Sequence, residues 1–105
     1  MRRGDVHRFK LPRGIGHEQH GERYAVVVQA DELLPRSVVL VAPTSRSARP
    51  ASFRPEVEVG STRTRVLVEQ TAAVDARRLG ARAGRLSAQE LWVVDDALRL
   101  VLGLD

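Results

Sequence analysis

Two short apolar runs decide the fold class, and they read YAVVV at residues 24–28 and VVLVA at residues 38–42. Both are rich in β-branched residues and neither alternates with polar residues, which is typical of strands buried on both faces. Residues 56–59 (EVEV) do alternate, as a half-exposed strand should, and residues 60–61 supply a turn. The sequence therefore predicts a sheet of short strands.

Further strands are expected at residues 5–11, 65–69 and 85–86. The apolar residues of the first of these are irregularly spaced, which predicts a bulge or a local twist. Pro43 is expected to stop the preceding strand at residue 42 and to leave residues 44–47 as a polar loop, because proline cannot donate to a sheet ladder.

The last quarter of the chain predicts a helix. Ser87 and Glu90 have the spacing of a capping box, and Gly103 is a suitable residue to end the helix. Between them, apolar residues recur at helical spacing and form one stripe. That stripe consists of Leu91, Val94, Leu98, Val101 and Leu102. Several short strands and one terminal helix indicate a mainly β fold, an antiparallel barrel with a helix packed on it.

The length and composition suit a single small domain over residues 1–105. The longest apolar runs are far shorter than the ~20 residues that a membrane-spanning helix needs. No apolar segment near the N-terminus has the character of a secretory signal, so we expect a cytoplasmic protein. Because the chain has no Cys, it can form neither a disulfide nor a thiolate zinc site, and it has no cysteine nucleophile.

The chain is basic, with 17 Lys and Arg residues against 13 acidic ones and a formal net charge of +4. All of these cations except Lys10 are Arg. Guanidinium groups bind phosphates with two parallel hydrogen bonds and stack on bases, so an Arg-rich basic domain is a candidate for nucleic-acid binding. A simply solvated, Arg-rich surface accounts for the charge equally well.

Metal and nucleotide sites are not expected. His17 and His20 are three residues apart, but they lie in a glycine-flanked loop with no third ligand in sight. The GIG sequence at residues 14–16 lacks the following Lys and the strand-to-helix context of a phosphate-binding loop. The sequence therefore predicts a protein that uses no cofactor.

Two polar loops, residues 16–23 and 43–46, lie directly beside the buried strands. Polar loops anchored on a rigid sheet are where binding and catalytic sites are usually built. Turns are polar in most proteins, however, and the residue pattern alone favours that plainer interpretation.

Five parts of the chain resemble the MazF/PemK toxin family, and they occur in the family's order. They are RGDV at residues 3–6, GHEQHGERYAVVVQ at 16–29, VAPTS at 41–45, VEQ at 68–70 followed by VD at 74–75, and GRLS at 84–87 followed by DDAL at 95–98. The resemblance extends over residues 3–104. The order and separation of these segments make it more specific than any single motif.

The resemblance implies an SH3-like small barrel that forms a homodimer and cuts single-stranded RNA at specific sequences without a metal. It implies attack by the ribose 2′-hydroxyl on the adjacent phosphate, which gives 2′,3′-cyclic phosphate and 5′-hydroxyl ends. By motif position, Arg23 would supply positive charge at the phosphate, Thr44 would hydrogen-bond the phosphate, and Glu18 is the first candidate for the general base. A cognate antitoxin with an acidic tail is the implied protein partner.

The remaining site residues implied by the resemblance would contact RNA. They are His17, Gln19, His20, Ser45, Arg46, Glu69 and Gln70. His17 and Glu69 are also alternative candidates for the general base, although Glu69 could equally form a structural ion pair with Arg65 or Arg78. Residues 12–22 and 44–52 are expected to set the choice of RNA sequence.

The chain departs from the family pattern at several positions. Tyr24 stands where the family usually has Pro, residues 72–73 (AA) replace a frequent Arg-Thr, and Leu67 occupies the position of an additional catalytic Arg. A family member that binds RNA or an antitoxin without cutting is therefore an alternative. A gyrase poison of the CcdB type is a weaker one, because such proteins act through a C-terminal Trp-Gly-Ile. Here the only Trp is Trp92, which is expected in the core or on a dimer surface.

Overall fold

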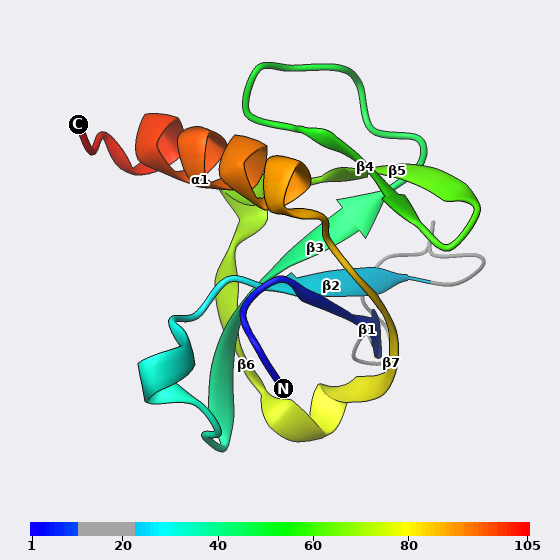
Figure 1. The fold of residues 1–105 in the computed structure, drawn as a ribbon, viewed down its shortest axis with the longest axis vertical. Coiled ribbons are helices and arrows are strands. Elements are labelled where there is room, and N and C mark those ends of the chain that lie inside the picture. The colour runs from blue at the N-terminus through cyan, green and yellow to red at the C-terminus, as the bar shows by residue number, and fades with distance from the viewer. Residues whose placement is uncertain (11–22) are drawn as a thin grey trace.

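The computed structural model describes residues 1–10 and 23–105, and it shows one antiparallel sheet with a single α-helix packed against it (Figure 1). The strands of the described part are β1 (Asp5–Phe9), β2 (Tyr24–Val27), β3 (Val38–Ser45), β4 (Glu56–Val59), β5 (Thr62–Val66), β6 (Ala72–Asp75) and β7 (Leu79–Arg85). The helix is α1 (Ala88–Leu102), and three single turns of 3₁₀ helix are η1 (Asp31–Leu33), η2 (Val68–Gln70) and η3 (Ala76–Arg78). The strand order is β4-β5-β3-β2-β1-β7, with β6 also paired to β3.

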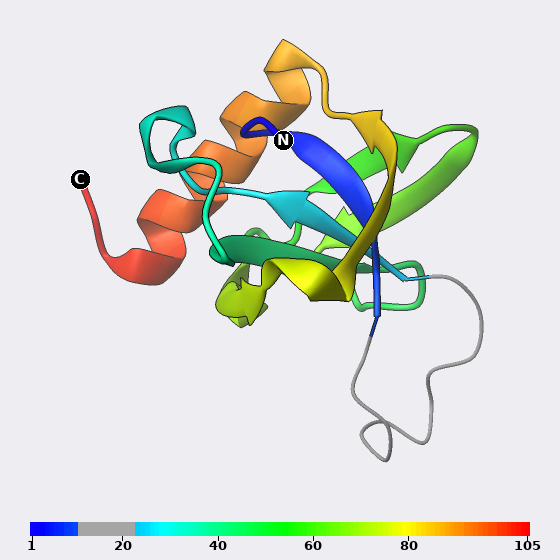
Figure 2. The same ribbon diagram turned by 90° about the horizontal axis from the view of Figure 1, so that it is seen from below.

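The sheet curls into a half-barrel (Figure 2), and buried apolar side chains pack in two clusters. Along the 24–28 run, Val26 and Val28 belong to the larger buried cluster, whereas Ala25 and Val27 belong to a smaller one. Because successive side chains of a strand point to opposite faces, the run supplies both clusters in alternation. The expectation of a mainly β small barrel with strands buried on both faces is confirmed.

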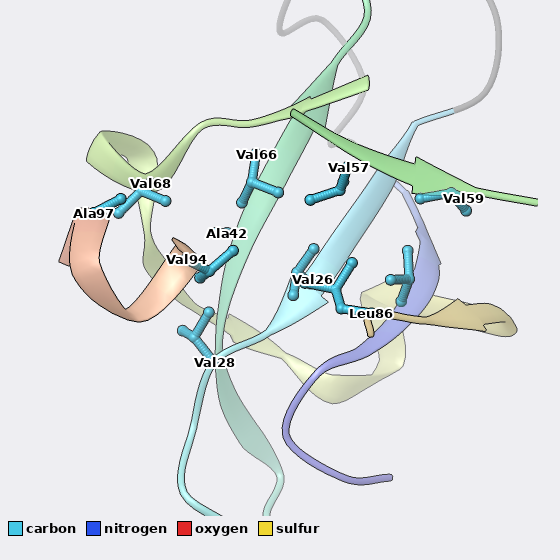
Figure 3. Packing of buried hydrophobic residues seen from close by; sticks show 11 residues of the cluster. Val26, Val28, Ala42, Val57, Val59, Val66, Val68, Leu86, Val94 and Ala97 are labelled. Atoms are coloured by element: carbon cyan, nitrogen blue, oxygen red, sulfur yellow. The ribbon is translucent and has the colours of Figure 1, made fainter. Parts of the chain in front are cut away.

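The larger cluster lies between the sheet and α1. Figure 3 shows Val94 and Ala97 of the helix beside Val28 and Val68, with Val66 next to them on β5. The predicted capping box is present, because the Glu90 amide donates to Ser87 Oγ at 3.1 Å and the Ser87 amide donates to Glu90 Oε1 at 2.8 Å. Together these contacts fix the start of α1 on the sheet.

The end of the helix differs from the prediction. Gly103 ends it in the left-handed conformation, as expected. Val101 and Leu102, however, were expected in the buried stripe, and Leu102 is 62% exposed. The last turn of α1 extends beyond the strands (Figure 2), and its apolar side chains are exposed. Trp92 is 67% exposed, which makes its placement in the core wrong.

The prediction that Pro43 ends its strand is also wrong, because β3 continues to Ser45. Pairing with β6 ends at Val41 and pairing with β5 begins at Thr44, so Pro43 lies where β3 changes partner along one edge. Its carbonyl accepts from the Leu67 amide at 2.8 Å. The ring nitrogen faces the same edge, where no ladder bond is required of it. Thr44 and Ser45 are therefore strand residues rather than loop residues.

The later strands also differ from the prediction. β5 ends at Val66, and the expected continuation to residue 69 is replaced by Leu67 and η2. β6 was not predicted, and β7 begins at Leu79 rather than at residue 85. The bulge expected near the start of the chain is confirmed by two register shifts between β1 and β7.

The N-terminal RGD segment is structural. Arg3 donates to Asp95 of α1 at 2.7 Å and to the carbonyl of Val28 at 2.8 Å, which joins the N-terminus to the helix and to β2. Gly4 has φ +92°, and a Cβ at this position would meet Leu91 at 3.3 Å. Glycine therefore permits both the turn and the close approach of α1.

The Asp5 carboxylate is buried beneath two arginines. It accepts from the Arg2 amide at 2.8 Å, from Arg85 at 2.9 Å and from Arg82 at 3.3 Å. Burial acts to raise the pKa of Asp5, but the hydrogen bonds from Arg2, Arg85 and Arg82 outweigh it and hold that pKa below its usual value. In the described part of the chain, no helix combines the length and apolar character that crossing a membrane requires.

Candidate active site

Arg23 and Thr44 come together because β2 and β3 are antiparallel neighbours. Arg23 directly precedes β2, and Thr44 is next to the last residue of β3. The register pairs Ala25 with Pro43, so the beginning of one strand lies beside the end of the other. The Arg23 guanidinium donates to the Thr44 carbonyl at 3.2 Å, and the backbone carbonyl of Arg23 accepts from the Phe9 amide at 2.9 Å. A cation is thereby held at the same strand end as a threonine.

The Thr44 side chain is almost fully enclosed, with 2% of the residue exposed. Its hydroxyl donates to the carbonyl of Tyr24 at 3.3 Å, a long hydrogen bond for a hydroxyl donor. The hydroxyl can therefore reach a phosphate only after it exchanges this bond for one to the substrate.

Ser45 and Arg46 extend the site beyond Thr44. Ser45 is the last residue of β3, and its side chain points to the opposite face of the sheet from that of Thr44. The Ser45 hydroxyl lies 3.4 Å from that of Ser47, and Arg46 is exposed. These groups surround the end of β3 on its solvent side.

Glu69 forms an ion pair, but with neither of the two arginines that we expected. Its Oε2 accepts from Arg54 Nε at 2.8 Å and lies 2.6 Å from Arg54 Nη2 in the same ion pair. Its Oε1 is buried without a hydrogen-bond partner among the described residues. The expected pairing with Arg65 or Arg78 is therefore wrong, and the carboxylate is bound to a guanidinium. The adjacent Gln70 is the last residue of η2, and its backbone amide donates to the Leu67 carbonyl at 2.9 Å.

Four of the predicted site residues lie outside the described residues. They are His17, Glu18, Gln19 and His20. The described residues that flank this segment are Lys10 and Arg23, at the neighbouring ends of β1 and β2. The structure thus brings together Arg23 and Thr44, whereas the Ser45 side chain lies on the opposite face of the strand and the candidate general base Glu18 lies outside the described residues.

Arg54 is the residue that sequence reasoning missed. It lies in the connection between β3 and β4, fifteen positions before Glu69. The sequence carries no periodic or motif signal for this contact. Leu67, at the position of an additional family Arg, is buried and belongs to the fold. Among the described residues, no group of three or more His, Cys, Asp or Glu side chains is placed to hold a metal ion.

The comparisons with known proteins agree with one another. The sequence profile of a family described as "PemK-like, MazF-like toxin of type II toxin-antitoxin system" matches residues 2–102. A candidate toxin of Mycobacterium tuberculosis is 46% identical over 90 residues, which cover 85% of this chain and 84% of that protein. Endoribonuclease MazF9 of Mycobacterium tuberculosis is 36% identical over 117 residues, covering 99% of this chain and 98% of the relative.

A solved structure supports the same fold assignment. An endoribonuclease in complex with its cognate antitoxin, from Mycobacterial species, superposes with a TM-score of 0.82. The superposition covers 100% of this chain and 97% of that one, at 17% sequence identity. The expected fold is thereby confirmed.

Proposed function

The chain belongs to the PemK-like, MazF-like toxin family of type II toxin–antitoxin systems, and on that premise we propose that it cuts single-stranded RNA at specific sequences without a metal. It is an endoribonuclease toxin, as its full-length relative MazF9 is named, and its protein partner is a cognate antitoxin. The support from the chain itself is the pairing of Arg23 with Thr44 at adjacent strand ends.

The proposed reaction is an internal displacement at phosphorus. The ribose 2′-oxygen loses its proton to a general base and forms a bond to phosphorus, while the bond from phosphorus to the 5′-oxygen breaks. The leaving oxygen takes up a proton, and the products carry 2′,3′-cyclic phosphate and 5′-hydroxyl ends. Extra negative charge builds up on the phosphate oxygens in the transition state, so fixed hydrogen-bond donors and cations favour it over the ground state.

Arg23 and Thr44 supply those donors in the proposal. The guanidinium of Arg23 is fixed at its backbone by Phe9 and reaches the end of β3, so it is already oriented before RNA arrives. The Thr44 hydroxyl turns from the Tyr24 carbonyl to a phosphate oxygen. Loss of one such donor typically costs about 3–4 kcal/mol of transition-state stabilisation.

For the general base we propose Glu18, with His17 as the second candidate. Carboxylates and imidazoles are the usual bases of this kind of proton transfer. The carboxylate of Glu69 is less suited to the role because it is already ion-paired with Arg54, whose Nη2 lies 2.6 Å from it. Gln19, His20, Ser45, Arg46 and Gln70 remain proposed RNA contacts.

We also propose that the chain acts as a homodimer. Apolar side chains at the end of α1 are exposed, namely Leu100, Leu102 and Leu104. Exposed apolar residues in such a group commonly mark a protein interface.

The net charge of this chain, +4, is complementary to an antitoxin whose tail is acidic.

The test is cleavage of a long single-stranded RNA in EDTA, followed by mapping of the ends. We expect 5′-hydroxyl ends from the wild type and a loss of cutting in Arg23→Ala. Arg77→Ala is the matched control, because Arg77 is exposed on η3 and pairs only locally with Asp75. Cutting that continues undiminished in Arg23→Ala would show that the site is placed wrongly.

The alternative is a family member that binds RNA without cutting it. Ala72 and Ala73 favour it, because both are exposed on β6 where many relatives carry a cation. RNA binding by the wild type without any new 5′-hydroxyl ends would select this alternative.

A further inference from the structure

The Arg54 guanidinium connects η2 to the segment between β3 and β4. Nε donates to Glu69 of η2 at 2.8 Å, Nη2 forms an ion pair with the same carboxylate, and Nη1 donates to the Arg49 carbonyl at 3.2 Å. The group also lies over the Phe53 ring, 5.6 Å from its centroid. A planar guanidinium with five donors can satisfy a carboxylate and a carbonyl at once, which an ammonium group does less well.

The backbone of Arg54 is held as firmly as its side chain. Its amide donates to the Ala51 carbonyl at 3.0 Å, and its carbonyl accepts from Arg65 Nη1 at 3.0 Å. The next residue, Pro55, accepts from the Val66 amide at 2.9 Å. Residues 46–53, which we name the β3–β4 loop, are therefore tied to β5 and η2 at their C-terminal end and to β3 at their N-terminal end.

The ion pair is partly shielded from water, with each side chain 25% exposed. Shielding strengthens the attraction between the charges and makes an unpaired partner costly. Among the described residues, Arg54 provides the hydrogen bonds that the Glu69 carboxylate receives, and Oε1 has none. Movement of the loop away from η2 would therefore separate Arg54 from the Glu69 carboxylate.

We propose that Arg54 is a positioning residue that fixes the β3–β4 loop against η2 and thereby sets which RNA sequences are cut. The proposal rests on the proposed function and deepens it. The loop begins directly after Thr44 and Ser45, and it carries Arg46 and Arg49, whose side chains have the chemistry to bind phosphates and base edges. Glu69 acts in this arrangement as the anchor of the loop rather than as an RNA contact.

The experiment compares Arg54→Ala and Glu69→Gln with wild type on a mixed pool of single-stranded RNA sequences. The readout is the ratio of the cleavage rate at the preferred sequence to that at the next-best sequence. We expect Arg54→Ala to lower this ratio about tenfold, since a well-oriented contact discriminates by about that factor. Cutting of poor sequences should persist, because Arg23 and Thr44 are unchanged.

The matched control is Arg63→Ala, which removes an exposed guanidinium on β5 that lies 3.5 Å from Glu56. It should leave the sequence preference as it is. Amide hydrogen exchange supplies a readout independent of activity, and the amides of residues 46–53 should exchange faster in both test variants than in the control.

Either of two cleavage results would overturn the proposal. One is an active wild type whose sequence preference is unchanged in both test variants. The other is an equal loss of cutting at every sequence, which would indicate general damage. If Arg54→Ala fails to fold, the nearly isosteric Glu69→Gln decides. A wild type that cuts no RNA would refute the proposed function, whereas unchanged hydrogen exchange in the loop would refute the positioning role by itself.

Discussion

Replacing Thr44 by Val separates the proposed chemistry at this residue from its part in the fold. Val conserves the branched shape of the side chain and removes only the hydroxyl. In the free protein that hydroxyl makes one long hydrogen bond, 3.3 Å to the Tyr24 carbonyl, in a residue that is 2% exposed. A neutral hydrogen bond of this kind contributes about 0.5–1.5 kcal/mol, so we expect the free energy of unfolding to fall by about 1 kcal/mol or less.

The effect of the same substitution on catalysis should be much larger. If the hydroxyl donates to the phosphate in the transition state, its loss should slow cutting by about 10²–10³-fold. The assay is single-turnover cleavage of a preferred RNA with enzyme in excess, beside urea unfolding of the same preparations. Thr44→Ser, which keeps the hydroxyl, should retain most of the rate.

Thr64→Val is the matched control for Thr44→Val. Thr64 is a second buried threonine, 4% exposed, on the neighbouring strand β5. The control should change stability by a similar small amount and leave the cleavage rate at the wild-type value. The reasoning is refuted if Thr44→Val cuts as fast as the control, because the Thr44 hydroxyl would then serve only the fold.

Three further predictions concern stability and assembly. Asp5→Asn should lower the free energy of unfolding at neutral pH by about 2–3 kcal/mol. The pKa of Asp5 is lower in the folded than in the unfolded protein, so this contribution to stability is fully present above pH ~3.9 and is lost as the pH falls through the folded pKa. A stability difference between the variant and the wild type that persists in strong acid would contradict this prediction. Leu102→Asp should convert dimers to monomers in sedimentation without moving the urea midpoint of the monomer, and a dimer that persists would place the interface elsewhere. Ser87→Ala removes the side chain of the capping box and should lower the free energy of unfolding by about 1 kcal/mol, which corresponds to a melting temperature lower by about 4–8 °C. An unchanged melting temperature would contradict this prediction.

The parts of the fold that the sequence predicts well are those encoded locally. The 24–28 run is β-branched throughout, and the structure uses it on both faces, with Val26 in one cluster and Val27 in the other. The α1 helix is equally local, because its cap, its buried face and its terminal glycine follow one another in sequence. Its last turn was predicted wrongly, since Leu102 keeps the helical spacing of the stripe after the sheet beneath it has ended, and Trp92 is exposed rather than in the core.

The parts that were predicted wrongly depend on pairing between distant segments. Pro43 ends a strand only if its nitrogen must donate, and here β3 exchanges one partner strand for another at that residue. Residues 72–75 (AAVD) lack the composition of a strand, yet they form β6 because β3 offers them an open edge. Neither fact can be read from a local window of sequence.

One part of the candidate site was predicted from the sequence and another part was not. The proximity of Arg23 and Thr44 follows from the resemblance, and β2–β3 pairing places the two residues together across 21 positions. The partner of Glu69 could not be chosen in advance, because several arginines were available and the β3–β4 loop has no regular geometry. The one that binds it, Arg54, is selected by the path of that loop.

The arginines of this chain differ more in their partners than in their charge. Arg3, Arg54 and Arg85 each contact a carboxylate, so the positive charge of these side chains is compensated within the fold. Among the described residues, by contrast, the contact of Arg23 is a neutral carbonyl, that of Thr44. A guanidinium that contacts a neutral carbonyl keeps its attraction for an arriving phosphate, whereas one bound to a carboxylate has largely lost it. The net charge of +4 therefore says little about where RNA binds, because the arginines bound to carboxylates differ from those, such as Arg23 and Arg65, whose contacts in the described part of the chain are carbonyls.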